Sequence, residues 1–273
     1  MNGFQLSDND FHRLSLFVHQ ICGIHLHKGK RELIRARLSK RIRTLSLGGF
    51  GEYYDFLIND RSGNEQGEML NAISTNLTSF YREPGHFKFM SEVVLPRFAA
   101  TDAPTLNIWS AGCSTGEEAY SILMCCLEYF HKYGAGIVNI LASDISTRVL
   151  DAAVTGIYPA SAIHHLPVQF KKRYFQKGQH KKAEYVRVKP ELRQHIKFRY
   201  INLMTPFPFK RRFDVIFCRN VMIYFQKAVQ ENLVEKYYES LKPSGYLFIG
   251  HSETLMGKTH HFKYIMPTIY QKE

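Results

Sequence analysis

Two adjacent carboxylates follow a glycine-flanked turn near the middle of the sequence. Residues 108–121 read I-W-S-A-G-C-S-T-G-E-E-A-Y-S, a pattern typical of a buried strand, a tight turn and the start of a helix. Such a turn presents backbone N–H groups and a helix N-terminus to a small ligand. Glu117 and Glu118 would repel a phosphate and attract an ammonium or sulfonium group. The turn therefore favours a cationic, nucleotide-like cofactor over ATP or NAD.

Polar side chains also end the neighbouring candidate strands. Asp144 ends the next strand, where a doubly wound sheet binds ribose hydroxyls, although it could equally cap the following helix. Arg219 and Asn220 follow a later strand at the same expected edge. Tyr224 is the only hydroxyl in the apolar run after them, and its alternative role is a core aromatic. Arg82 could bind a substrate carboxylate or be an ordinary surface arginine.

The same turn also matches the G-x-S-x-G pattern of a hydrolase nucleophile. Ser114, Asp214 and His251 would then form the triad. An α/β-hydrolase has several strands before this serine, whereas the sequence here is helical upstream of the turn. The two glutamates would also disfavour an oxyanion. We therefore expect a cofactor turn and a structural role for His251.

The elements that position these residues change in kind along the chain. The apolar spacing predicts helices at 7–23, 30–47, 51–59, 65–76 and 85–99, the second with an apolar stripe at Leu33, Ile34, Leu38, Ile42 and Leu45. Strands are expected at 106–110, 138–143, 196–201, 213–218 and 246–250, with helices between them. This alternation predicts a parallel, doubly wound α/β sheet. A closing hairpin is expected at 262–272 and a small antiparallel insertion at about 173–199.

Composition and charge limit the possible partners. The 273 residues are 45% hydrophobic with a net charge of +12, and the segment from Lys28 to Arg43 has eight basic residues against one acid. This segment indicates an acidic partner without identifying it. No apolar run approaches the roughly 18 residues of a membrane span, and no secretory signal is evident. Five cysteines without C-x-x-C spacing predict reduced thiols in a cytoplasmic protein.

Six blocks of the sequence resemble the CheR family, the chemotaxis receptor methyltransferases that use S-adenosylmethionine to esterify receptor glutamates. They are TNLTSFYRE (75–83), WSAGCSTGEEAYSI (109–122), ASDIS (142–146), INL (201–203), FDVIFCRNVMIYF (213–225) and SGYLFIGHSE (244–253). The resemblance implies a class I methyltransferase sheet with a closing antiparallel hairpin. It also implies an N-terminal all-helical receptor-docking domain with its linker at 1–84 and a methyltransferase domain at 85–273. The small inserted β-subdomain would lie at about 173–199.

The resemblance further implies the residues of the site. Cofactor contacts would fall on Asn76, Thr78, Arg82, Glu118, Asp144, Asn202, Leu203, Arg219 and Asn220, and the methyl-transfer centre on Arg82 and Tyr224. Asp144 would bind the ribose diol and Glu118 would lie toward the methionine end, while Asn202 and Leu203 would flank the adenine. A glutamate is already ionised at neutral pH, so we expect neither a general base nor a metal.

The resemblance also gives the basic segment a partner. It would lie along the acidic cytoplasmic methylation helices of membrane chemoreceptors, and we expect the docking face at Arg35, Arg37, Arg41 and Arg43. The alternative is a merely solvated helix face. Family members that tether to a receptor's C-terminal pentapeptide have a glycine-rich loop in the β-subdomain. The loop here, KGQHKKAEYVRV (177–188), keeps only Gly178, so we expect direct docking without that tether.

Two other functions fit part of the sequence. The basic charge is compatible with a nucleic-acid methyltransferase, but FCRNVMIYF offers no N-P-P-Y-like motif for a base nitrogen. A non-catalytic, cofactor-binding receptor adaptor would keep the fold, but the intact Arg82, Asp144 and Tyr224 argue against lost catalysis. We therefore expect a cytoplasmic protein-glutamate O-methyltransferase that binds no nucleic acid.

Overall fold

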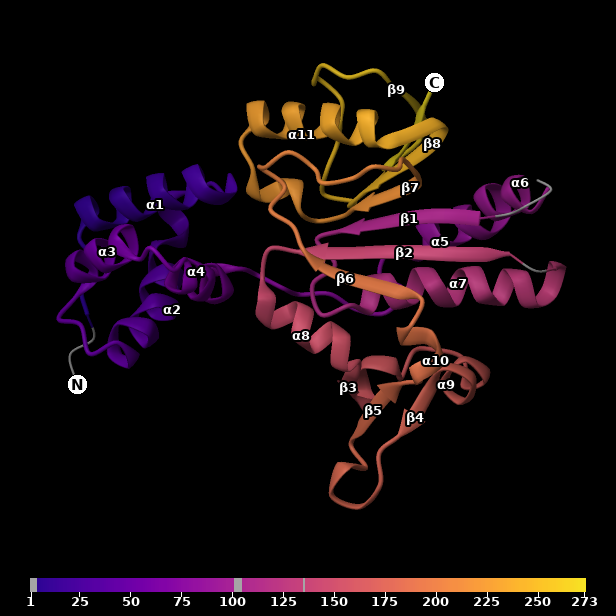
Figure 1. The fold of residues 1–273 in the computed structure, drawn as a ribbon, viewed down its shortest axis with the longest axis horizontal. Helices are drawn as coiled ribbons and strands as arrows, with labels where there is room; N and C mark the ends of the chain where they lie inside the picture. The colour runs from indigo at the N-terminus through magenta and orange to yellow at the C-terminus, as the bar shows by residue number, and fades with distance from the viewer. Residues whose placement is uncertain (1–3, 101–104, 135) are drawn as a thin grey trace.

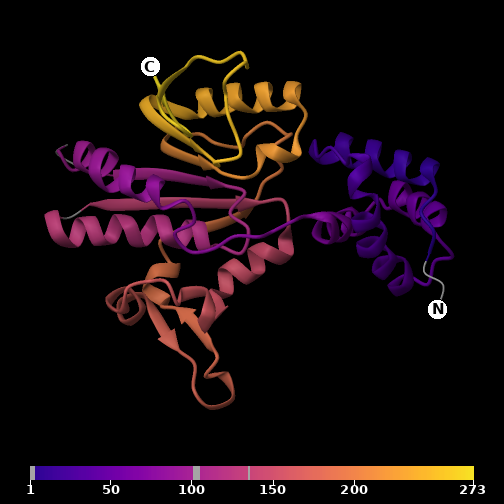
Figure 2. The same cartoon turned by 180° about the vertical axis from the view of Figure 1, so that it is seen from behind.

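The N-terminal part of the chain is a small bundle of helices with its own core. The computed structural model describes residues 4–100, 105–134 and 136–273. In the bundle, Ser7 caps the first helix by accepting the N–H of Asp10, and Gly23, at φ +73°, ends it. The bundle contains α1 (Asp8–Cys22), the short η1 (Lys28–Lys30), α2 (Arg31–Thr44), α3 (Phe50–Asn59) and α4 (Asn64–Ile73) (Figures 1 and 2).

Helix α2 departs from its prediction in two ways. It ends at Thr44, before the expected Leu47. Ile34, Leu38 and Ile42 of the predicted stripe are buried, but Leu33 is 39% exposed. Neighbouring residues on a helix point about 100° apart, so Leu33 cannot share the buried row of Ile34. The apolar side chain of Leu33 is therefore free to line a pocket, described below.

The rest of the chain is built on a mostly parallel, seven-stranded sheet. The strand order is β6-β2-β1-β7-β8-β10-β9, and β10 runs antiparallel to both of its neighbours, β8 and β9, whereas the other neighbouring strands pair in parallel. This is the class I methyltransferase architecture, and the closing hairpin is confirmed. The strands are β1 (Thr105–Ala111), β2 (Ile137–Asp144), β6 (Ile196–Tyr200), β7 (Phe213–Cys218), β8 (Leu241–Ile249), β9 (Phe262–Met266) and β10 (Ile269–Lys272).

Helices cover both faces of this sheet, so its strands are apolar on both sides. Ile108 faces a core formed with α7, whereas Trp109, the next residue, faces a core formed with α11. Figure 1 shows α11 above the sheet and α7 below it. The helices around the sheet are α5 (Pro84–Phe89), the π-helical η2 (Met90–Val94), α6 (Leu95–Ala99), α7 (Glu117–Tyr133), α8 (Thr147–Thr155), η5 (Met222–Tyr224) and α11 (Lys227–Ser240).

The inserted β-subdomain covers a different range from the predicted 173–199. It is a separate three-stranded antiparallel sheet in the order β3-β5-β4, which begins at Ile157. Residues 196–200 belong instead to β6, which pairs with β2 in the main sheet. The first strand has three residues and ends in a proline, so it carries little strand signal. The elements are β3 (Ile157–Pro159), η3 (Ala160–Ile163), α9 (Val168–Tyr174), β4 (Phe175–Lys177), η4 (His180–Lys182), β5 (Tyr185–Val188) and α10 (Pro190–Arg193).

The cysteines and helix lengths bear on two further expectations. All five cysteines are buried and free of disulfides. Across the described ranges, every helix is too short or too polar to cross a membrane.

Candidate active site

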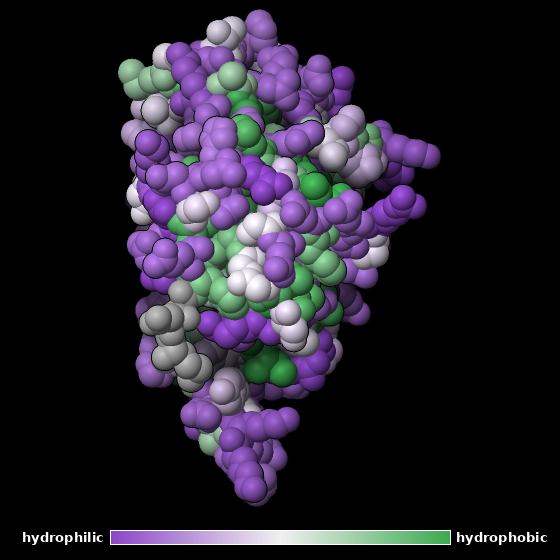
Figure 3. All heavy atoms as spheres, turned by 90° about the vertical axis from the view of Figure 1, so that its left-hand side faces the viewer, coloured by the Kyte–Doolittle hydropathy of each residue, from purple (hydrophilic) through white to green (hydrophobic). Residues whose placement is uncertain are grey.

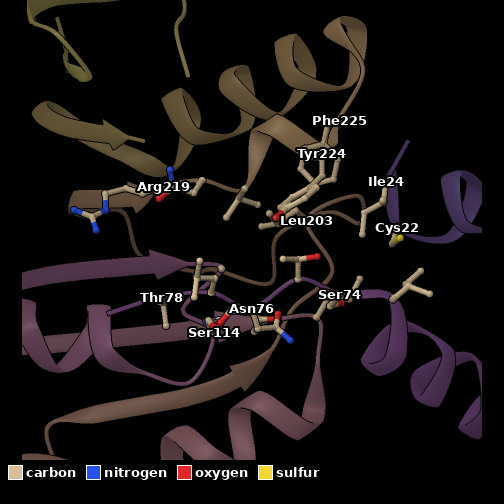
Figure 4. Close-up of a pocket in the computed structure, with 18 of the residues that line it drawn as sticks. Cys22, Ile24, Ser74, Asn76, Thr78, Ser114, Leu203, Arg219, Tyr224 and Phe225 are labelled. Carbon is tan, nitrogen blue, oxygen red and sulfur yellow. Dashed lines mark hydrogen bonds between the residues drawn. The ribbon is translucent and has the colours of Figure 1, made fainter. Parts of the chain in front are cut away.

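A pocket lies between the helical bundle and the carboxyl ends of the central strands (Figure 4). Its empty volume, which includes space open to solvent, is about 1140 Å³. In Figure 4, Tyr224 points into this space from one side, and Asn76, Thr78 and Ser114 lie across from it. All the predicted cofactor and methyl-transfer residues line the pocket: Asn76, Thr78, Arg82, Glu118, Asp144, Asn202, Leu203, Arg219, Asn220 and Tyr224.

The glycine turn is shaped by close packing. Gly112 has φ +88°, and a Cβ there would lie 2.4 Å from Val221 Cγ2. At Gly116 a Cβ would lie 2.8 Å from the Cβ of Ala153. Ser114, between them, donates its hydroxyl to the Asn76 carbonyl at 3.0 Å. Since that hydroxyl is bonded to a backbone carbonyl and not to a histidine, the hydrolase interpretation is wrong.

Asp144 connects the turn to the end of β2. Its two carboxylate oxygens accept the backbone N–H groups of Ser114 and Ser146, each at 2.9 Å. Ser146, and not Asp144, caps α8. Burial raises the pKa of Asp144, which is 9% exposed. Each oxygen keeps a further lone pair, so Asp144 can also accept hydroxyl groups from a ligand in the pocket.

Only one of the paired glutamates lines the pocket, and its charge is compensated. Glu118 Oε2 lies 2.8 Å from Arg219 Nε, and Glu118 Oε1 accepts the Ser110 hydroxyl at 2.7 Å. Glu117 is bonded to the hydroxyl of Thr115 at 2.6 Å and does not line the pocket. Consecutive helix residues diverge, so the two carboxylates cannot act together. The expectation that both glutamates attract a cation is therefore wrong.

Arg219 continues this network into the sheet domain. It donates to the Arg82 carbonyl at 2.8 Å and contacts His86 Nδ1 at 3.0 Å. The other nitrogen of His86 lies 2.7 Å from the Thr268 hydroxyl, which donates to a backbone carbonyl. This arrangement assigns the proton of His86 to Nε2. Burial and the charge of Arg219 lower the pKa of His86 to about 3, so the ring is neutral.

These hydrogen bonds also bear on metal binding. Glu83, His86 and His251 offer ligand atoms within 4.8 Å of one another. However, a metal needs a free nitrogen lone pair, and both ring nitrogens of His86 are already hydrogen-bonded. Glu83 also lies 3.9 Å from the cationic Arg219. The three residues therefore fit a structural network better than a metal site.

Glu253 shapes the loop after β7 and was missed by sequence reasoning. Its carboxylate accepts the backbone N–H groups of Gly250, Asn220, Val221, Met222 and Ile223, at 2.5–3.3 Å. The bonds stabilise Asn220 at φ +59° and place the loop against the pocket. The only signal was its position in the SGYLFIGHSE block, since a lone acid after a strand does not predict such a role.

The predicted methyl-transfer residues come from different segments, Arg82 from just before α5 and Tyr224 from η5. Arg82 donates to the Leu77 carbonyl at 2.9 Å, and 34% of its side chain is exposed. Tyr224 lies on η5 and is partly buried against the pocket, so it is not a core aromatic. Lys30 Nζ lies 4.7 Å from the centre of the Tyr224 ring. The helical bundle thus contributes to the pocket, which the sequence did not predict.

A second contact between bundle and sheet involves a predicted cofactor residue. The Asn202 amide donates to the Ile21 carbonyl at the end of α1, at 2.6 Å. Its oxygen accepts the N–H of Met204 at 3.0 Å. Leu203 and Ile201 beside it add apolar surface to the pocket. Asn202 therefore fixes the bundle against this end of the sheet.

The four arginines of the predicted docking face differ in their surroundings. Arg37 donates to the carbonyls of Ile73 and Ser74, and Arg41 pairs with Glu65 through two bonds. Arg35 pairs with Glu32 at 2.8 Å on the surface. Arg43 is exposed. Figure 3, which views the molecule from the side of the helical bundle, shows hydrophilic residues around a central area of white and green residues. Arg37 and Arg41 are thus engaged within the fold, whereas Arg43 points to solvent.

Comparisons with known proteins identify the family of the chain. Residues 76–271 match the model of the CheR methyltransferase SAM-binding domain, and residues 9–74 match the CheR all-alpha domain. Among solved structures, a glycopeptide N-methyltransferase complexed with sinefungin is similar over 58% of this chain and 47% of its own, at 13% identity and a TM-score of 0.34.

Curated relatives match over nearly their whole length. Chemotaxis protein methyltransferase 2 of Pseudomonas aeruginosa is 41% identical, covering 98% of this chain and 94% of its own. The chemotaxis protein methyltransferase of Borreliella burgdorferi is 40% identical, with coverages of 99% and 98%. That of Escherichia coli is 37% identical, with coverages of 97% and 91%. The chain belongs to the CheR family and is an S-adenosylmethionine-dependent methyltransferase of chemotaxis.

Proposed function

We propose that this enzyme methylates glutamate side chains on the cytoplasmic helices of chemoreceptors and works in the cytoplasm. The observation that carries the proposal is the position of Arg82 and Tyr224 in the same pocket as the cofactor residues. The relatives, which are named chemotaxis protein methyltransferases, support it. The products would be glutamate methyl ester and S-adenosylhomocysteine.

The pocket residues fit S-adenosylmethionine. Asp144 offers carboxylate lone pairs to hydroxyls, and Leu203 with Ile145 offers apolar surface to a base. The ion pair of Glu118 and Arg219 presents one negative and one positive charge. This suits the methionine end of the cofactor, which carries an ammonium and a carboxylate. The cofactor supplies a methyl group on a sulfonium, from which a neutral thioether is a good leaving group. We propose that Asn76, Thr78, Asn202 and Asn220 complete this binding site.

The residues of the methyl-transfer centre need not move a proton. A glutamate with a pKa of about 4.3 is ionised at neutral pH, so its oxygen is ready to attack. Arg82 would orient this carboxylate, and the hydroxyl of Tyr224 would position it for its approach to the methyl group. Orientation of this kind can supply several kcal/mol of the barrier reduction.

We propose that the helical bundle, with the linker to about residue 84, is the docking unit and that residues 85–273 form the methyltransferase unit. Arg35 and Arg43 are available for contact with an acidic helix, while Arg37 and Arg41 keep α2 in place. The loop at 177–188 carries the exposed Lys181 and Lys182 after Gly178. Its charge and lack of further glycines favour direct docking over a pentapeptide tether.

Transfer of labelled methyl from S-adenosylmethionine tests the proposal. We expect label on receptor cytoplasmic fragments and none on RNA. Tyr224→Phe and Arg82→Ala should lower turnover strongly, while calorimetry shows the protein still binds S-adenosylhomocysteine. A wild type that binds the cofactor but labels no fragment would support the adaptor alternative. Label on RNA with steep salt dependence would support a nucleic-acid substrate.

A further inference from the structure

The pocket contains one cation without a carboxylate partner. Three cationic side chains line it within the described chain. Arg219 is paired with Glu118 at 2.8 Å, and Arg82 donates to the Leu77 carbonyl and lies 4.0 Å from Glu83. For Lys30, no carboxylate of the described residues lies within 4.0 Å of the ammonium. An anionic ligand would therefore find its least compensated partner at Lys30.

The fold fixes Lys30 beside Tyr224. A backbone bridge joins Ile24 to Phe225, and the N–H of His25 donates to the Tyr224 carbonyl at 2.8 Å. The segment then continues into η1, which ends at Lys30. Lys30 Nζ lies 4.7 Å from the centre of the Tyr224 ring, a cation–π distance. The ammonium is thus positioned relative to the same residue that we assign to methyl transfer.

The surroundings make this ammonium receptive to an anion. Lys30 is partly buried, and burial together with the charge of Arg37 lowers its pKa. An ammonium that has lost part of its hydration gains more from a charged partner than one in water. Hydrogen bonds between charged groups are also stronger than neutral ones. A substrate carboxylate at Tyr224 would supply that partner.

We propose that Lys30 binds the carboxylate of the substrate glutamate and selects it over glutamine and over the methyl ester. This inference rests on the proposed function. Methylation joins a carboxylate oxygen to the methyl carbon while the carbon–sulfur bond breaks, so the substrate's negative charge and the sulfonium charge both disappear and no proton moves. The neutral ester then lacks the charge that Lys30 binds. Lys30 therefore acts as a specificity residue that also favours product release.

The test measures selectivity rather than activity alone. Receptor fragments with one target glutamate, or glutamine in its place, are titrated into the full-length protein with S-adenosylhomocysteine bound. The wild type should prefer the glutamate fragment by about tenfold or more, as expected for a charge-assisted contact. Lys30→Met should remove most of this preference and raise KM more than it lowers kcat. Lys30→Arg should restore much of the preference.

Lys132→Met is the matched control. Lys132 Nζ also lies 4.7 Å from a tyrosine ring centre, that of Tyr133, but at the end of α7 distant from the pocket. It should behave as the wild type. The proposal is overturned if Lys30→Met keeps its preference for the glutamate fragment. It is also overturned if Lys30→Met loses affinity for S-adenosylhomocysteine by the same factor as for the glutamate fragment, which would indicate a structural role. A wild type that methylates no carboxylate would overturn the proposed function itself, and this inference with it.

Discussion

Arg219 and Glu118 form a buried ion pair in the pocket, with 2.8 Å between Nε and Oε2 and side chains that are 2% and 8% exposed. Removing one partner of such a pair leaves an uncompensated charge in a medium of low dielectric. The pair is also the point where β7, α7 and the segment before α5 meet. The contribution of this ion pair to stability can be measured without cofactor, apart from its contribution to cofactor binding.

Arg219→Met should lower the free energy of unfolding by about 3–5 kcal/mol, measured by urea denaturation without cofactor. Lys227→Met is the control, because Lys227 pairs with Glu231 at 3.9 Å on the surface, where such pairs contribute about 0–1 kcal/mol. Equal, small effects of both variants would show that the buried pair does not stabilise the fold.

Gly112→Ala should weaken cofactor binding by about tenfold or more, because its methyl group would displace Val221 from the wall of the pocket. Gly63→Ala is a matched control. Gly63 also has a positive φ, +71°, but a Cβ there meets nothing within 4 Å. Both variants should lose about 1 kcal/mol of stability through backbone strain, and Gly112→Ala should lose more because its methyl group overlaps Val221. Calorimetry with S-adenosylmethionine should distinguish them, and equal affinities would contradict the packing argument.

His86 should make the fold sensitive to acid. Its pKa is lowered to about 3 in the folded protein, whereas the unfolded chain takes up the proton near pH 6.5. This contribution to stability is complete above about pH 6.5 and is lost as the pH falls toward 3. Between pH 6.5 and 5 the loss should be about 2 kcal/mol.

Glutamine can make both hydrogen bonds of His86 without titrating, so His86→Gln should flatten the pH dependence of the unfolding free energy. His131→Gln, at an exposed histidine of α7, should leave the wild-type slope in place. An unchanged slope in His86→Gln would refute the assignment.

Alanine variants of Arg43 and Arg41 should distinguish an effect on receptor docking from an effect on fold stability. Arg41→Ala leaves Glu65, whose side chain is 6% exposed, without its cation and should cost about 3 kcal/mol of unfolding free energy. Arg43→Ala should change stability by less than about 0.5 kcal/mol. It should instead raise the KM for receptor fragments several-fold, most clearly at low salt. An unchanged KM at low salt would remove Arg43 from the docking face.

The sheet and the pocket could be predicted because local patterns specify them. Apolar runs locate the five central strands, and the polar residues that end them, such as Asp144 and Arg219, meet at one edge. Long-range partners could not be predicted in this way. Nothing near Glu253 shows that it binds the loop after β7, and nothing near Arg37 shows that it bonds to the end of α4. In the sequence, Lys30 is one of many basic residues, and only the fold shows that it lies beside Tyr224.

The identity of the methylated group decides whether the enzyme is a protein-glutamate O-methyltransferase. After incubation with S-adenosylmethionine, a receptor cytoplasmic fragment is digested and the modified peptide is sequenced by mass spectrometry, before and after mild alkali. We expect one methyl group on a glutamate side chain, removed by alkali and absent when that residue is glutamine. A methyl group that survives alkali, or that lies on a nitrogen or a nucleic acid, would contradict this expectation.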